Sequence, residues 1–129
     1  AASVVRFWNM NLFQLGSFVL HSGSPSSWKI DCDVLSQKDW QALAIIAREF
    51  LPDYGPVEGV PRGGLLFADA LRQYSTPDGP LLIVDDVAST GRSMEIQRAG
   101  REAIGCVVFA RGNYPWWVLP LFRMPGTGV

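Results

Sequence analysis

Two strand–loop–helix units follow one another between Val57 and Ala110, and this order limits the possible folds more than any other feature of the chain. Residues 57–60 and 81–84 are short apolar runs that predict strands, and a loop of small residues follows each of them. A third apolar run, residues 106–110, predicts another strand. Strands that alternate with helices predict an α/β fold with a mostly parallel sheet flanked by helices.

Three helices complete this core. Two of them are expected over residues 65–74 and 92–105, directly after the two loops. The other is expected over about 37–51, because Ser36 and Asp39 have the spacing of a capping box. Its apolar positions predict a buried face made of Trp40, Leu43, Ala44, Ala47, Phe50 and Leu51.

The 129 residues suit one domain, 1–129, in three parts. Residues 1–35 predict a small N-terminal arm or hood, with a helix over 3–15 and a β-hairpin formed by 17–23 and 27–31. Residues 36–112 form the core. Residues 113–129 are an aromatic, proline-rich tail to which the sequence assigns no element.

Charge and composition exclude several classes of protein. The formal net charge is −1, with no basic run or stripe, so we expect no nucleic-acid partner. No signal peptide and no apolar run of membrane-spanning length is present, so we expect no membrane partner and a cytoplasmic location. Cys32 and Cys106 form no metal-binding motif and are expected to be small buried side chains.

The segment LLIVDDVASTGRSM, residues 81–94, combines two chemistries at the end of a strand. In open α/β sheets, ligands bind beyond the carboxyl ends of the strands, where Asp85 and Asp86 are expected. The small-residue loop and the following helix N-terminus suit a phosphate. The carboxylates suit hydroxyl groups or a hydrated Mg²⁺ ion. A phosphorylated sugar has both features; the alternative is an ordinary strand–turn–helix in which these residues are caps.

The same segment closely resembles the phosphoribosyl-pyrophosphate (PRPP) motif of type I phosphoribosyltransferases. That motif is an apolar strand, two acidic residues and a small Thr/Ser-Gly loop. The resemblance implies that Asp85 and Asp86 are the catalytic residues and hold the ribose hydroxyls, and that Mg²⁺ is the cofactor, bound through PRPP and water. It also implies a binding loop for the 5′-phosphate made of Ala88, Ser89, Thr90, Gly91, Arg92 and Ser93.

A second loop supports this resemblance. The segment GVPRGG, residues 59–64, ends the preceding strand and resembles the pyrophosphate loop of the same family. Adjacent glycines expose backbone N–H groups to an anion. The resemblance implies pyrophosphate binding by Val60, Pro61, Arg62, Gly63 and Gly64. By itself this loop is better interpreted as a plain turn.

The N-terminal arm points to the base. Residues 16–31 resemble the arm of orotate phosphoribosyltransferases, which carry a G-x-F-x-L-x-S-G run followed by Ser and Asp. The resemblance implies that PRPP and a nucleobase, with orotate favoured, are the partners of the protein. Its implied base-binding residues are His21, where the family usually has Lys, together with Trp28, Lys29 and Arg111. The alternatives are core packing for Trp28 and a solvated surface charge for Arg111.

Two features of the sequence leave functions other than orotate transfer open. Only residues 75–80 join a helix to the PRPP strand, where the family has a long mobile basic loop. A PRPP- or nucleotide-binding protein without turnover is therefore an alternative. The tail resembles aromatic segments that cap the base in some purine phosphoribosyltransferases, and Trp116 or Trp117 could stack on the base. Transfer to a purine or to uracil is therefore a further alternative. Family members are commonly dimers, and a homodimer is expected.

Overall fold

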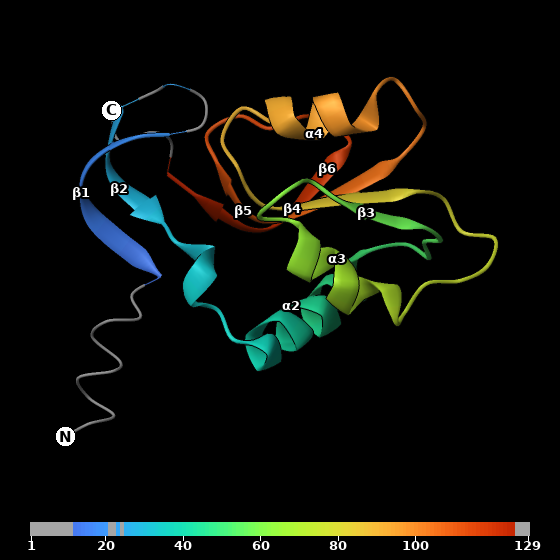
Figure 1. The fold of residues 1–129 in the computed structure, drawn as a ribbon. Coiled ribbons are helices and arrows are strands. Elements are labelled where there is room, and N and C mark those ends of the chain that lie inside the picture. The colour runs from blue at the N-terminus through green and yellow to red at the C-terminus, as the bar shows by residue number, and fades with distance from the viewer. Residues whose placement is uncertain (1–11, 21–22, 24, 126–129) are drawn as a thin grey trace.

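The chain folds into a parallel sheet with a small hairpin beside it (Figure 1). The structure, a computed structural model, describes residues 12–20, 23 and 25–125. Two helices cover one face of the sheet and one covers the other. In chain order the elements are β1 (Phe13–Val19), β2 (Pro25–Ile30), a 3-10 turn (Cys32–Val34), α2 (Gln37–Phe50), β3 (Val57–Gly59), α3 (Leu65–Arg72), β4 (Leu82–Ala88), α4 (Arg92–Arg98), β5 (Ile104–Arg111) and β6 (Val118–Met124).

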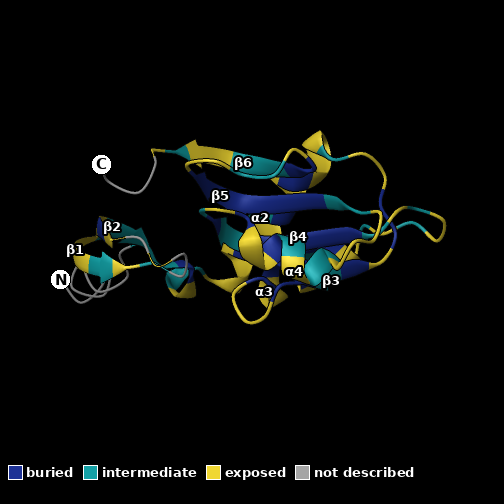
Figure 2. Cartoon of the chain, turned by 90° about the horizontal axis from the view of Figure 1, so that it is seen from above, coloured by how far each residue is buried: buried dark blue, intermediate teal, exposed yellow. Residues whose placement is uncertain are grey.

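The four-stranded sheet has the order β3-β4-β5-β6, and every pair in it is parallel. This confirms the α/β fold predicted from the strand–helix alternation. Alternate residues of β4 face opposite sides of the sheet, so the strand contributes to two cores. Leu82 and Val84 pack under α2 and α3, whereas Ile83 packs with Met94 of α4. Figure 2 shows the central strands as the most continuously buried part of the chain.

The start of α2 is the one that the sequence predicts. The Asp39 amide donates to Ser36 Oγ at 3.1 Å, and the Ser36 amide donates to Asp39 Oδ2 at 2.8 Å. Together they satisfy two of the amides left open at the helix start. Trp40, Ala44 and Ala47 are buried as expected, but Phe50 is 66 % exposed, so that part of the predicted buried face is wrong.

Several predicted elements need correction. Residues 13–15 belong to strand β1, so the helix expected over 3–15 is wrong there; residues 1–11 lie outside the described residues. The strand β4 continues through the two aspartates to Ala88 instead of ending at residue 84. Helix α4 ends at Arg98, seven residues before the expected end. The tail contains a strand, β6, that the sequence analysis did not assign.

The predicted hairpin is confirmed as the antiparallel pair β1 and β2, but both strands lie earlier in the chain than the expected 17–23 and 27–31. It lies at the end of the sheet where β4 and β5 reach their carboxyl ends (Figures 1 and 2). Phe13 of β1 packs its ring edge-on against Phe109 of β5, with 6.0 Å between centroids. The hairpin therefore forms a hood over the edge of the sheet where the sequence predicts a ligand. Within the described residues, no helix is both long enough and apolar enough to cross a membrane.

Candidate functional site

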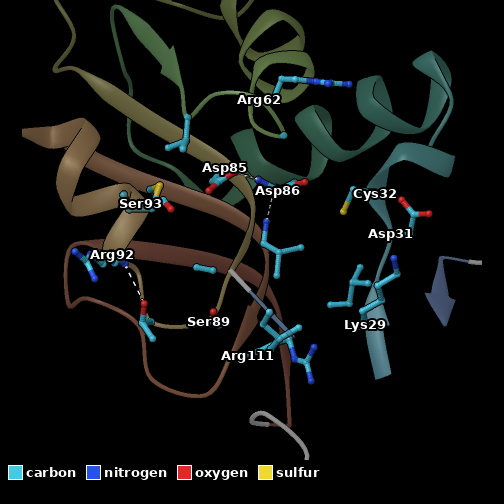
Figure 3. A pocket seen from close by; sticks show the side chains of 18 of the residues that line it. Lys29, Asp31, Cys32, Arg62, Asp85, Asp86, Ser89, Arg92, Ser93 and Arg111 are labelled. Carbon is cyan, nitrogen blue, oxygen red and sulfur yellow. Dashed lines mark hydrogen bonds between the residues drawn. The ribbon is translucent and has the colours of Figure 1, made fainter. Parts of the chain in front are cut away.

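A cleft of about 1450 Å³ lies between the hood and the carboxyl ends of the parallel strands (Figure 3). Three predicted groups contribute to its wall. They are residues 60–63 from the loop after β3, residues 85–93 from β4 and its loop, and Lys29 with Arg111 from the hood and β5. Segments that are far apart in the sequence thus meet at a single site.

Asp85 and Asp86 lie within β4, where the strand passes under the cleft. Asp85 is 7 % exposed, and its Oδ1 accepts a hydrogen bond from the Asp86 amide at 2.8 Å. The Asp86 Oδ1 in turn accepts from the Val87 amide at 2.7 Å. Burial, with the neighbouring side chain of Asp86 as a second cause, raises the pKa of Asp85 to about 8.

The loop after β3 fits closely against the aspartates. The Val60 amide donates to the Val84 carbonyl at 2.8 Å, which fixes the start of the loop to β4. A Cβ atom on Gly63 would lie 2.4 Å from Asp86 Oδ2, and one on Gly64 would lie 2.5 Å from the Val84 carbonyl oxygen. A side chain at residue 64 would collide with the backbone of β4, and one at residue 63 would displace the carboxylate of Asp86. The glycines thus let this loop and the acidic pair line one wall.

Arg62 belongs to the same loop and is exposed. Its side chain extends along the mouth of the cleft from the loop (Figure 3). The peptide bond between Pro61 and Arg62 is cis. Gly64 is buried behind the loop and does not line the cleft. A guanidinium at this edge suits a phosphate group.

The second loop turns sharply into α4. Gly91 has a φ of +78° and precedes the helix, and a Cβ on it would lie 2.2 Å from Pro115 Cδ. The Arg92 amide donates to Thr90 Oγ1 at 3.3 Å. Ala88 is the last residue of β4 and is buried, so the turn itself consists of residues 89–91 and leads into Arg92 and Ser93. Residues 89–93 line the cleft, and the hydroxyls and amides of such a turn suit an anion.

The predicted base-binding residues divide between two places. Lys29 and Arg111 line the cleft. Trp28 does not; its ring lies under the Arg111 guanidinium, with 3.4 Å from Cζ to the ring centroid. Arg111 is 1 % exposed, which excludes the solvated surface charge, and burial lowers its pKa. His21 lies outside the described residues.

Comparisons with known proteins agree on the fold. No protein-family model matches the chain, and no curated protein matches it by sequence. Solved structures do match. An orotate phosphoribosyltransferase from Aeropyrum pernix superposes with a TM-score of 0.71 at 23 % identity, over 95 % of this chain and 93 % of the other. The chain has the type I phosphoribosyltransferase fold.

Two further structures support this assignment. The orotate phosphoribosyltransferase of Mycobacterium tuberculosis H37Rv, solved in complex with Fe(III) dicitrate, matches with a TM-score of 0.65 at 16 % identity, over 95 % of each chain. UMP synthase from Leishmania donovani matches with a TM-score of 0.67 at 18 % identity, over 90 % of this chain and 34 % of that one. The sequence resemblance and the structural similarity therefore point to the same fold.

One part of the phosphoribosyltransferase pattern differs. Residues 75–80, where the resemblance implies a long mobile loop, form a compact turn. The Thr76 amide donates to the Tyr54 carbonyl at 2.7 Å, and the Gly55 amide donates to the Pro80 carbonyl at 2.8 Å. The turn is therefore fixed to the chain before β3. This short connection carries no lysine or arginine that could reach over the cleft.

Several residues that line the cleft were not assigned to the site from the sequence. Asp31, Cys32 and Asp33 lie on the hood side, and the apolar side chains of Leu66 and Ile96 lie at its rim. Asp31 belongs to the motif of the N-terminal arm, so the sequence could have identified it as a residue of the site. The two apolar residues are exposed positions on amphipathic helices, and sequence alone gives no reason to place them at a cleft.

The two tryptophans that could stack on a base, Trp116 and Trp117, lie away from the cleft. Trp116 is 90 % exposed and does not line it. Trp117 is buried against α4, where its indole N–H donates to Glu95 Oε1. The Arg98 guanidinium covers the Trp117 ring at 4.6 Å. Trp117 is therefore a packing residue of the face that α4 covers.

Proposed function

We propose that this protein is a phosphoribosyltransferase that transfers ribose 5-phosphate from PRPP to orotate. In this reaction the bond between C1′ and the diphosphate oxygen breaks, and a bond from C1′ to N1 of the base forms. Pyrophosphate leaves, and the N1 proton of the base is released. Positive charge develops on the ribose as the first bond breaks, so the site needs anions close to the sugar and hydrogen-bond donors at both phosphate positions.

The convergence of three predicted elements carries this proposal. The acidic pair lies between the glycine loop and the turn before α4, and all three line the same cleft. Gly63 approaches Asp86 so closely that a side chain at residue 63 would displace the Asp86 carboxylate. PRPP has a ribose between a diphosphate and a 5′-phosphate, and this order of groups matches the order of the elements.

Each element then has a role. Asp85 and Asp86 accept hydrogen bonds from the ribose hydroxyls, and the Asp86 carboxylate stabilises the positive charge on the sugar. The glycine loop and Arg62 bind the diphosphate, and residues 89–93 bind the 5′-phosphate. Positioning of the two reactants within one cleft supplies much of the rate acceleration.

Magnesium is part of the proposal. Among the described residues, no group of three or more His, Cys, Asp or Glu is arranged to hold a metal ion directly. The carboxyl groups of Asp85 and Asp86 would suit the water shell of a Mg²⁺ ion held on the diphosphate of the substrate. Such an ion supplies charge neutralisation of the leaving group.

A second candidate rests on the turn at residues 75–80. A cleft that stays open to water weakens the charge interactions within it and allows hydrolysis. A protein that binds PRPP or a nucleotide without turnover would retain both phosphate loops and would not need a lid. Binding without product formation distinguishes this candidate from the enzyme.

The test is one assay with purified protein, PRPP, Mg²⁺ and orotate. Loss of orotate and appearance of orotidine 5′-phosphate are followed together, with the double variant Asp85→Asn/Asp86→Asn as the control. Turnover that vanishes in the control supports the enzyme. An absence of turnover at high protein concentration and long times contradicts the orotate reaction. Pyrophosphate release with adenine, guanine, hypoxanthine or uracil in place of orotate then tests the other bases.

We also propose a homodimer in the cytoplasm. Exposed apolar side chains on α2, at Ile45, Ile46 and Phe50, support a contact between copies, as does Trp116. Cys32 and Cys106 are both free and buried, which suits a reducing compartment. Light scattering during size-exclusion chromatography measures the oligomeric state; a monomer at all concentrations contradicts the dimer.

A further inference from the structure

Two cations reach the hood side of the cleft, and they differ in what holds them. Lys29 lies on β2 and Arg111 at the end of β5 (Figure 3). The sequence resemblance implies that Arg111 binds the carboxylate of orotate. The geometry of both side chains leads to a different division of roles.

The guanidinium of Arg111 is held by contacts with the hood. Its Nη1 donates to the Trp28 carbonyl at 3.1 Å, and its Nη2 donates to Ser26 Oγ at 2.8 Å. The guanidinium stacks on the Trp28 ring, and the residue is 1 % exposed. A bidentate carboxylate needs access to the edge of a guanidinium. For Arg111, that access requires the hood to move away from the sheet.

Lys29 has the opposite arrangement. Successive side chains of a strand point to opposite faces, so Lys29 lies on the other face of β2 from Ser26 and Trp28, which contact Arg111. Its side chain lines the cleft and is half-buried. The ammonium lies 4.9 Å from the centroid of the Phe18 ring, and within the described residues it makes no ion pair. A carboxylate in the cleft can therefore reach Lys29 without displacing a protein carboxylate.

The same strand connects the two residues. The Trp28 carbonyl that accepts from Arg111 belongs to the peptide unit that leads directly to Lys29. Arg111 thus fixes the backbone beside Lys29, and the ring of Phe18 restricts the ammonium. A cation that is positioned before binding loses less conformational entropy when the ligand arrives.

We propose that Lys29 is the specificity-determining residue that recognises an anionic substituent of the base, and that Arg111 is a positioning residue that holds β2 in place. This inference rests on the proposed function, because it concerns the base half of that site. It predicts that the cleft prefers a pyrimidine with a ring carboxylate over one without it. Orotate and uracil differ by that group alone.

The experiment measures the affinity of orotate and of uracil by isothermal titration, in Mg²⁺ and pyrophosphate, and takes their ratio. In Lys29→Met, we expect orotate affinity to fall by about tenfold or more while uracil affinity changes less than about twofold. Lys29→Arg keeps the charge and should retain the preference. Lys38→Met, an exposed lysine on α2, is the matched control and should change neither affinity.

Ser26→Ala tests the positioning role without removing a charge. It removes one acceptor of Arg111, so both affinities should fall by a similar factor and their ratio should stay unchanged. Ser26→Thr, which keeps the hydroxyl, should restore both. A structural loss alone would lower the melting temperature without this rescue of binding.

Three results overturn the inference. They are a wild type with no preference for orotate, a preference that survives in Lys29→Met, and a ratio that collapses in Ser26→Ala while Lys29→Met has no effect. Failure of the enzyme is a separate outcome. Turnover can be absent with every base while the orotate preference and its loss in Lys29→Met persist, because these are equilibrium measurements.

Discussion

Asp85→Asn should make the protein more stable at alkaline pH. Burial and the neighbouring Asp86 raise the pKa of Asp85 from an ordinary 3.8 to about 8. Between these two values the folded protein holds a proton that the unfolded chain releases. The free energy of unfolding therefore falls as pH rises through this window, and the stabilisation is fully present only below the unfolded pKa.

The size of the effect follows from the shift. Each pKa unit corresponds to about 1.4 kcal/mol, so a shift of about four units sets a ceiling of about 5 kcal/mol. The two carboxyls interact and share the cost of ionisation, so we expect about 2 kcal/mol at about pH 8. An asparagine carries no charge to desolvate, and it keeps the volume of the side chain.

Urea unfolding of wild type and Asp85→Asn, followed by circular dichroism at about pH 5 and about pH 8, gives the difference at each pH. The stability of the variant relative to the wild type should be greater at the higher pH than at the lower one. Asp53→Asn, at an exposed carboxylate, is the control and should show no such change between the two values. A constant difference across pH, or an Asp85→Asn variant that is less stable at the higher pH, refutes the reasoning.

Three further substitutions test other parts of the account. Gly64→Ala places a Cβ 2.5 Å from the Val84 carbonyl oxygen, a backbone atom that cannot rotate away; we expect a loss of at least about 2 kcal/mol in urea unfolding, and wild-type stability would contradict the packing. Tyr54→Phe removes a buried 2.6 Å hydrogen bond from the phenol to a carbonyl of α3; thermal unfolding should show a loss of about 1 kcal/mol, and no loss would contradict it. Hydrogen bonds from Arg101 and a neighbouring glutamine hold the pKa of Glu58 at about 2. Glu58→Gln should lower the melting temperature slightly at neutral pH, and the difference should vanish as pH falls toward 2; a difference that persists in acid would contradict this.

The parts of the fold that sequence predicts best are those with a strong local signal. The capping box at Ser36 and the apolar runs of β3, β4 and β5 specify their elements through local hydrogen bonding and periodicity. The end of α4 had a local signal too, because a glycine, Gly100, follows the last turn of the helix; the structure gives this residue a φ of +76°.

Long-range contacts determine what the sequence did not predict. Residues 13–15 have helical spacing with the segment before them, but pairing with β2 and the contact of Phe13 with Phe109 favour a strand. The strand β6 contains Pro120, which argued against a strand until its place at the edge of the sheet was known. Long-range contacts also determine the surroundings of Arg111. The sequence resemblance predicted that this residue binds a ligand, but only the structure reveals that Nη1 and Nη2 both donate hydrogen bonds to β2.

A PRPP titration tests the central claim that the acidic pair and the two loops form one site for a phosphorylated ribose. Isothermal titration of PRPP with Mg²⁺ into the wild type should give saturable binding to one site per chain. The double variant Asp85→Asn/Asp86→Asn should lose that binding while it unfolds as cooperatively as the wild type. Binding that is absent in the wild type, or unchanged in the double variant, contradicts the site described here.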